Sequence, residues 1–327
     1  MAPQALAGQP DPDETIEPAA DPARALAIAS PVRVAAGPSP RPRALTYARA
    51  CRPRQWSKNL LVLAAPCAAG VIDRTSVALE VAGAFAVMCA VSSAAYLIND
   101  VRDREQDRVH PTKRLRPVAA GEVSPRAAVV LAIALAGIAL AGGAAIAPGL
   151  ALAALLYLLL TLSYSIWWRG VAVLDILVIA AGFVLRPLAG AEASDVYLSH
   201  WFVLVTAFGA VFLVTAKRLA ELREQRGAEP LRASLRMYSQ RRLVVALAVA
   251  AAACSAGYVG WALTRPAHVA WYAASVAPFL AWLVRYAMLI GAGAGQAPEE
   301  LILRDRVLLA LSIVWSLLFL GGVYVSH

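Results

Sequence analysis

The stretch Asn99–Asp107 holds the residues whose types and spacing are best suited to chemistry. Asn99, Asp103 and Asp107 recur every four residues directly after an apolar run, so on a continued α-helix their side chains lie near one stripe. Mg²⁺ is commonly held by one or two carboxylates together with water and substrate phosphate oxygens. The pattern therefore predicts a catalytic Mg²⁺ site at these three residues, with Asp100 as a weaker candidate in the same motif.

Cations follow the acidic motif closely. Lys113, Arg114 and Arg116 lie a few residues downstream, and Lys and Arg side chains bind phosphate oxygens through charge-assisted hydrogen bonds. A metal ion beside several cations suits a reaction in which a diphosphate leaves, because both neutralise the charge on the departing group. The alternative interpretation is a solvated loop of mixed charge between two helices.

The chain around these residues is too apolar for a soluble protein. Of its 327 residues, 60% are hydrophobic and only 16% are charged, which is typical of a polytopic membrane protein. The net charge of +9 falls mostly in a few loops. No nucleic acid partner is expected, because no soluble basic domain is present to bind one. The four cysteines show no paired spacing, which argues against a disulfide framework or a zinc site.

The sequence divides into a polar tail and a membrane domain. Residues 1–46 are rich in Pro, Ala, Asp and Glu and predict a disordered cytoplasmic tail that lacks the pattern of a signal peptide. Residues 47–327 predict one all-α domain of nine transmembrane helices. The candidate spans lie at about 56–72, 77–98, 126–147, 150–168, 171–190, 200–217, 243–263, 270–290 and 307–325.

The distribution of basic loops supports nine spans. Lys and Arg are dense before the first span, between the second and third, and between the sixth and seventh. Nine crossings put all of these loops on one face, so the positive-inside rule predicts a cytoplasmic N-terminus and an outside C-terminus. The expected location is the plasma membrane. The two long polar loops, 99–126 and 217–242, then share one face and predict a single central cavity with a polar cytoplasmic cap.

The second polar loop and the spans add further candidates. Lys217 and Glu221 have helical spacing, so the sixth span is expected to continue out of the membrane; positive-inside bias explains the cations here but not the glutamate. Asp175 reads as a lone carboxylate near the interface. Arg186 is expected to snorkel to the outer interface or to line the cavity. Tyr164 fits an aromatic belt at the interface.

Five segments resemble known membrane transferases. The Asn99–Asp107 stretch resembles the first aspartate motif of UbiA-type membrane prenyltransferases. More narrowly, four other segments resemble the phosphoribosyltransferases of that superfamily that act on decaprenyl phosphate. These segments are Arg52–Asn59, His110–Pro117, Ala216–Leu222 and Leu303–Arg306.

The resemblance implies transfer of 5-phosphoribose from phosphoribosyl pyrophosphate to a polyprenyl phosphate, with Mg²⁺, to make precursors of cell-wall arabinan. It implies that Asn99, Asp103 and Asp107 bind Mg²⁺ and pyrophosphate, and that Glu221 orients the ribose hydroxyls. The lipid phosphate is already anionic at neutral pH, so no strong general base is required. The other implied substrate contacts are Lys58, Lys113, Arg114, Arg116, Lys217 and Arg218, and Tyr164 is kept as a further candidate.

Two other functions stay open at this point. A UbiA-type prenyltransferase or terpene cyclase acting on a prenyl diphosphate is expected to need a second acidic cluster, but no Asp occurs between Asp195 and Asp305. A transporter would place ionisable residues deep in its spans, whereas the carboxylates here lie at span ends and in loops. The sequence leaves open the prenyl chain length and whether the chain forms a homo-oligomer.

Overall fold

The computed structural model describes residues 42–168, 170–224, 237–264, 269–293 and 298–325. Most of the predicted tail, residues 1–41, lies outside these ranges. Helix α2 (Arg43–Ala50) already includes the last residues that the sequence assigned to the tail.

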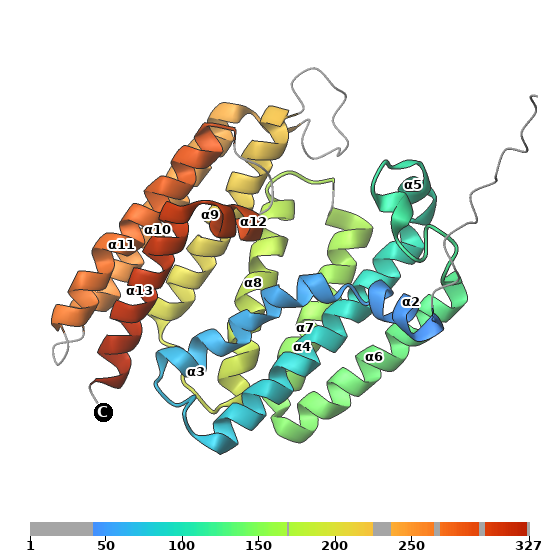
Figure 1. Cartoon of the computed structure of the whole chain (residues 1–327), viewed down its shortest axis with the longest axis horizontal. Helices are drawn as coiled ribbons and strands as arrows, with labels where there is room; N and C mark the ends of the chain where they lie inside the picture. Colours follow the sequence, from blue (N-terminus) through green and yellow to red (C-terminus); the bar gives the residue numbers. More distant parts are fainter. Residues whose placement is uncertain (1–41, 169, 225–236, 265–268, 294–297, 326–327) are drawn as a thin grey trace, which may run out of the picture. The chain divides into compact units, whose positions relative to one another are not determined.

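Within the described ranges every regular element is a helix, which confirms the all-α prediction (Figure 1). The long helices are α4 (Thr75–Arg102), α6 (Pro125–Ile146), α7 (Pro148–Ser163), α8 (Leu174–Ala193), α9 (His200–Glu224), α10 (Gln240–Leu263), α11 (Val269–Gly291) and α13 (Arg306–Tyr324). The short ones are the 3₁₀ helices η1 (Pro53–Leu63) and η2 (Lys113–Leu115), the π-helical turn η3 (Tyr164–Trp168), α3 (Ala64–Ala68), α5 (Arg104–Val109) and α12 (Pro298–Arg304).

The count of nine spans is not confirmed. The described residues contain eight helices long and apolar enough to cross a membrane, and the first predicted span instead forms η1 and α3. These elements have 11 and 5 residues, and a 3₁₀ helix rises about 2.0 Å per residue against about 1.5 Å for an α-helix. Together they rise about 30 Å, which equals the thickness of a hydrocarbon core. The larger rise per residue of the 3₁₀ helix therefore lets this short apolar segment extend as far as a hydrocarbon core is thick.

Side-chain caps explain where several helices begin. Ser124, Ser239 and Asp305 each accept a hydrogen bond, at 2.8–3.2 Å, from the backbone N–H three residues later. Pro125 also fits the first position of α6, because its missing N–H has no partner there in any helix. A cap of this kind stabilises a helix by roughly 0.5–2 kcal/mol. The starts of α6, α10 and α13 are therefore encoded locally.

The long helices pack in two groups that share α8. In the first group α4 packs on α6, α7, η1 and α8; in the second α9 packs on α10 and α11, and α11 packs on α13 (Figure 1). Ala189 of α8 belongs to the core of the first group, and Ile176 of the same helix belongs to the core of the second. Helix α8 is therefore the common wall of both groups.

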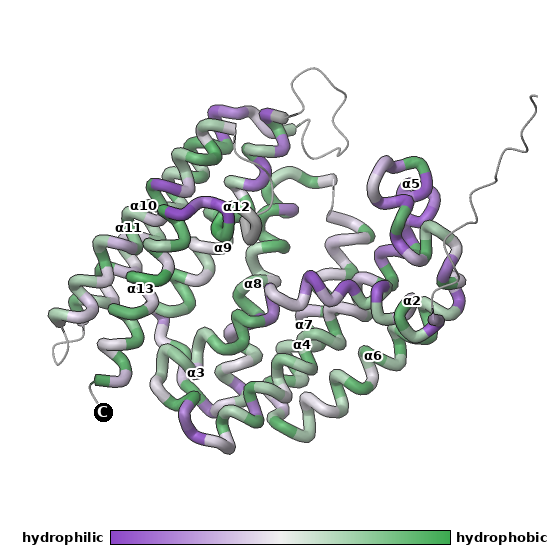
Figure 2. Tube along the Cα trace, viewed as in Figure 1, coloured by the Kyte–Doolittle hydropathy of each residue, from purple (hydrophilic) through white to green (hydrophobic). Residues whose placement is uncertain are grey.

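Hydrophilic residues gather around α5 and the loop that follows it, whereas the long helices are apolar along most of their length (Figure 2). The polar residues that could do chemistry therefore lie mainly at helix ends, as the sequence predicts.

Candidate active site

The acidic motif crosses the junction of two helices. Helix α4 ends at Arg102 and α5 begins at Arg104, with Asp103 between them. The Asp103 N–H donates to the Asn99 carbonyl at 2.9 Å, and the Asp107 N–H donates to the Asp103 carbonyl at 2.8 Å. The four-residue register assumed from the sequence therefore continues across the break.

Two arginines bind the buried carboxylates of this motif. Arg52 pairs with Asp100 Oδ1, and Arg116 Nη1 lies 3.3 Å from the same oxygen and 2.5 Å from Asp107 Oδ2. Asp100 and Asp107 are only 2% and 3% exposed, whereas both arginines are partly exposed. We call Arg52, Asp100, Asp107 and Arg116 the Asp100 cluster. Sequence analysis predicted Arg116 as a phosphate contact and assigned no role to Arg52.

Two buried oxygens of the acidic motif that accept no hydrogen bond suit a divalent cation. Asn99 Oδ1 and Asp100 Oδ2 are buried and accept no hydrogen bond, which is costly for a polar atom without a ligand. In the described part of the chain, no three His, Cys, Asp or Glu side chains are grouped as a metal cage. Mg²⁺ needs no such cage, since it completes its shell with water and phosphate oxygens. The donor set therefore fits the predicted ion, with Asp100 a stronger candidate than the sequence alone suggests.

The other predicted cations on this side differ in exposure. Lys58 is half-buried on η1, and its Nζ donates to Gln55 Oε1 at 2.7 Å. Lys113 is half-buried on η2, and Arg114 beside it is exposed. His110 Nδ1 accepts from the backbone N–H of Lys113 at 3.3 Å, so this histidine shapes the loop. The three cations are accessible enough to meet a charged ligand.

A second polar cluster lies between α8, α9 and the start of α10. Arg218 Nε lies 2.9 Å from Asp175 Oδ2, and Arg218 Nη1 lies 2.6 Å from Glu221 Oε2. The Tyr238 hydroxyl donates to Asp175 Oδ1. We call Asp175, Arg218, Glu221 and Tyr238 the Arg218 cluster. The expectation that Asp175 is isolated was wrong, because its arginine partner comes from a helix 43 residues further along the chain (218 minus 175).

The turn into α8 is strained and is held by Tyr238. Val173 has φ 70°, an outlying conformation for a β-branched residue. Its N–H donates to the Tyr238 hydroxyl at 2.7 Å. Burial, and then the hydrogen bond to Asp175, raise the pKa of Tyr238 well above its ordinary value, so the hydroxyl stays protonated at neutral pH. Tyr238 therefore fixes both the strained turn and the carboxylate.

The π-helical turn η3 lies between the two clusters. Arg102, beside the acidic motif, donates to Ser165 Oγ at 3.2 Å. Tyr164, the preceding residue, interacts electrostatically with Arg218. Lys217 is half-buried on α9. π-Helical turns are often found at functional sites, and this one lies between Arg102 of the acidic motif and Arg218 of the second cluster.

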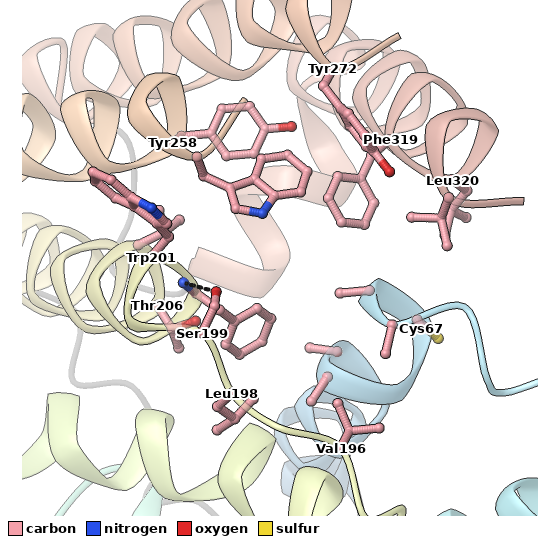
Figure 3. Close-up of a pocket in the computed structure, with 18 of the residues that line it drawn as sticks. Cys67, Val196, Leu198, Ser199, Trp201, Thr206, Tyr258, Tyr272, Phe319 and Leu320 are labelled. Carbon is pink, nitrogen blue, oxygen red and sulfur yellow. Dashed lines mark hydrogen bonds between the residues drawn. The ribbon is translucent and has the colours of Figure 1, made fainter. Parts of the chain in front are cut away.

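A large apolar pocket lies beside the start of α9, at the opposite end of that helix from Arg218. Its volume is about 940 Å³, and its walls come from α3, α9, α10, α11 and α13. Tyr258, Tyr272, Trp201 and Phe319 surround the space (Figure 3). Trp315 Nε1 donates to the Tyr258 hydroxyl at 2.8 Å, which fixes one aromatic wall. Sequence analysis missed this pocket, because its aromatic residues are spread over several spans.

The structure brings some predicted residues together and adds others. Asp100, Asp107 and Arg116 meet in one cluster, and Arg218 meets Glu221 in the other. Sequence reasoning assigned no role to Arg52, and it noticed Asp175 and Tyr238 without foreseeing their contacts with Arg218 and with each other. The only signal for Arg52 was its place in a segment that resembles the phosphoribosyltransferases.

Comparisons with known proteins agree with this architecture. A decaprenyl-phosphate phosphoribosyltransferase from Corynebacterium glutamicum is 41% identical over 287 residues, covering 85% of this chain and 86% of that protein. One from Mycobacterium tuberculosis is 42% identical over 273 residues, covering 82% and 90%. A solved structure of a UbiA homolog from Archaeoglobus fulgidus, bound to DMAPP and Mg²⁺, matches the fold with a TM-score of 0.66 at 20% identity, over 86% of this chain and 98% of that one.

A family profile gives the same result. The profile of the UbiA prenyltransferase family matches residues 60–309, which includes both polar clusters except Arg52. The chain therefore belongs to the UbiA prenyltransferase family.

Proposed function

We propose that this protein transfers 5-phosphoribose from phosphoribosyl pyrophosphate to a polyprenyl phosphate of the decaprenyl type, with release of pyrophosphate. The names of relatives at 41–42% identity support the reaction. The observation that carries it in the structure is the difference between the clusters. In the Asp100 cluster the Asp100 Oδ2 atom has no hydrogen-bond donor, and neither has Oδ1 of the adjacent Asn99, whereas Arg218 pairs with both carboxylates of the Arg218 cluster. A single metal centre suits phosphoribosyl pyrophosphate as the donor better than it suits a prenyl diphosphate, which would need two metal clusters.

The donor diphosphate is proposed to bind at the Asp100 cluster. Asn99, Asp100, Asp103 and Asp107 would hold Mg²⁺, which supplies charge neutralisation for the departing pyrophosphate. Arg52 and Arg116 orient the buried carboxylates through the ion pairs described above. Lys58, Lys113 and Arg114 are proposed to bind the phosphate oxygens.

The ribose and the acceptor phosphate are proposed to lie toward the Arg218 cluster. Glu221 would accept hydrogen bonds from the ribose hydroxyls, and Arg218 fixes this carboxylate at 2.6 Å. Lys217 and Tyr164 would contact the acceptor phosphate or the ribose. An oxygen of the lipid phosphate then forms the new bond to the anomeric carbon as the bond to pyrophosphate breaks. That oxygen is anionic at neutral pH, so no side chain has to remove a proton.

The apolar chain of the acceptor has a suitable place in the aromatic pocket. Its lining of tyrosine, tryptophan and phenylalanine side chains suits an isoprenoid chain. The polar clusters are proposed to face the cytoplasm, with the N-terminus on that side and the C-terminus outside, because the basic loops cluster there. The described residues contain eight helices long and apolar enough to cross a membrane, and we propose that the η1–α3 segment makes a ninth crossing, which this topology requires. We place the protein in the plasma membrane, where its product would feed the synthesis of cell-wall arabinan.

A transfer assay tests the proposal. Purified protein in detergent receives Mg²⁺, radiolabelled phosphoribosyl pyrophosphate and a polyprenyl phosphate, and label in the organic phase is measured. We expect transfer that requires Mg²⁺ and is lost in Asp103→Ala. Absence of transfer with several lipid lengths, together with pyrophosphate release from a prenyl diphosphate, would instead establish the prenyltransferase alternative.

A further inference from the structure

Arg186 is a deeply buried cation that the proposed chemistry does not use. It is 4% exposed in α8, and no carboxylate in the described part of the chain pairs with it. Its Nε donates to Asn59 Oδ1 at 2.8 Å, its Nη1 to the Gly182 carbonyl at 2.5 Å and its Nη2 to the Tyr157 hydroxyl at 3.0 Å. A charge among apolar spans is costly and usually marks function. The contact with Asn59 points to what that function is.

Asn59 lies on the buried face of η1, and that face repeats every three residues. Asn59 and Val62 are 0% exposed and Ala65 is 2% exposed, while Trp56, one step earlier, donates to Ser93 Oγ at 3.1 Å. A 3₁₀ helix has 3.0 residues per turn, so such a row stays straight. In an α-helix the same row would turn by about 120° between positions 56 and 62, which both lie in η1. Only 3₁₀ winding presents this row to one set of neighbours.

Helix α8 holds this row at two points. Arg186 binds Asn59, and one α-helical turn later Gly190 packs directly on Val62. A Cβ atom on Gly190 would overlap the Val62 carbonyl oxygen. Runs of 3₁₀ helix beyond 3–4 residues are uncommon because their hydrogen bonds are poorly aligned. The 11 residues of η1 therefore need support from outside the helix, and α8 provides it.

The winding of η1 sets the position of Arg52. Arg52 precedes η1 with φ 54°, stacks 5.1 Å from the Tyr96 ring centroid and pairs with Asp100. It lies seven residues before Asn59. Rewinding those residues as α-helix would move Arg52 by about 3.5 Å along the axis and rotate it by about 140° relative to Asn59. Such a change would break the ion pair with Asp100.

We propose that Arg186 is a positioning residue for the active site. By holding Asn59 it keeps η1 in 3₁₀ form, and this form places Arg52 against Asp100. The effect of this arrangement on catalysis rests on the proposed function; the arrangement itself does not.

Labelling of Cys51 tests the arrangement without any assay of activity. Cys51 is adjacent to Arg52 and half-buried, its carbonyl accepts from Ser93 Oγ at 2.9 Å, and burial raises the pKa of its thiol. We expect a water-soluble maleimide to modify Cys51 at least about fivefold faster in Arg186→Met, because η1 loses its fixed register. Peptide mass spectrometry assigns the modified cysteine, and buried Cys254 should stay unmodified.

A matched control separates this effect from general loosening. Ser275 is 0% exposed and is hydrogen-bonded at 2.7 Å to Tyr258 of α10 and to the Tyr272 carbonyl of α11. Ser275→Ala should leave the Cys51 rate unchanged. If Arg186→Met does not fold, Asn59→Leu replaces it with the same expected result. An unchanged Cys51 rate in a folded variant, or an equal rise in the control, would overturn the proposal.

A double-mutant cycle tests the effect on catalysis. Asn59→Leu and Arg52→Gln should each raise KM for phosphoribosyl pyrophosphate more than they lower kcat, and the double variant should resemble the stronger single variant. Independent action would multiply the two effects and would contradict the proposal. If the wild-type protein transfers no phosphoribose, the proposed function fails, and the Cys51 result still decides the role of Arg186.

Discussion

The Asp100 cluster and the Arg218 cluster use the same residue types in opposite ways. In the first, the arginines are 24% and 28% exposed and a carboxylate oxygen lacks a donor. In the second, Arg218 is 1% exposed and pairs with both carboxylates. Partly solvated ion pairs can exchange partners with a ligand, whereas a sealed pair is costly to break. We therefore expect the first cluster to exchange partners with the donor diphosphate, and Arg218 in the second to act structurally by holding Asp175 and Glu221 in place.

The largest expected effect is on catalysis at the Asp100 cluster. Asp107→Asn should lower the rate of phosphoribosyl transfer by roughly 10³-fold, because a ligand of the charge-neutralising centre is lost. The matched control is Glu105→Gln on the same short helix, whose carboxylate is 73% exposed and pairs with Arg108. Equal losses in both variants, measured as initial rates at saturating Mg²⁺, would show that the buried cluster has no special role.

The next effect is on stability at the Arg218 cluster. Arg218→Met leaves two buried carboxylates without their arginine, which should cost roughly 3–5 kcal/mol of unfolding free energy. Thermal unfolding in detergent measures this loss, and Arg241→Met, an exposed change on α10, provides the control. Wild-type stability together with a greatly raised KM for phosphoribosyl pyrophosphate would show instead that Arg218 binds substrate and has no structural role.

A smaller change is expected when Arg116 is removed. Arg116→Met should raise KM for phosphoribosyl pyrophosphate about tenfold, equivalent to about 1.4 kcal/mol, and should lower the unfolding temperature less than Arg218→Met does, because Asp100 keeps Arg52. KM rises because Asp100 and Asp107 lose an orienting partner that is itself partly exposed.

The control Arg108→Met removes the exposed pair of Arg108 with Glu105 on α5 and should leave KM unchanged. If Arg116→Met instead lost as much stability as Arg218→Met without a change in KM, the Asp100 cluster would have a structural role like that of the Arg218 cluster.

The smallest effect is expected at a third ion pair, between Arg285 and Asp305, which lies nearer the surface and serves as a reference for the two clusters. The hydrogen bond from Arg285 Nη2, at 2.7 Å, and the backbone N–H of Leu308 hold the pKa of Asp305 below its ordinary value. The stabilisation is present above the unfolded pKa and is lost as pH falls through the folded value. Asp305→Asn should therefore lower the unfolding temperature slightly at pH 7, and the difference should vanish in acid. A difference that persists at low pH would contradict this account.

The sequence predicted what depends on local spacing. The four-residue register of Asn99, Asp103 and Asp107 follows from their spacing. Eight of the nine predicted spans, which were inferred from the lengths of apolar runs, form long apolar helices. The pairing of Asp175 with Arg218 does not, because it depends on how α8 packs on α9. The functional roles of the site residues stay predictions until the variants above are measured.

The winding of η1 shows a different limit of sequence reasoning. Trp56, Asn59 and Val62 recur every three residues, so the period of a 3₁₀ helix is present in the sequence. Apolar residues such as Leu60 and Leu61 fill the positions between them, so the pattern resembles an ordinary span that is too short. Tertiary contacts with α4 and α8 select the 3₁₀ form.

The contact between Asn59 and Arg186 also has a consequence for biogenesis. The two residues are 127 positions apart, and at about 5–20 residues per second the first leaves the ribosome roughly 6–25 s before the second. During that interval the amide of Asn59 lacks its cationic partner. The first segment of the membrane domain to be synthesised therefore reaches its final conformation only after α8 has been inserted.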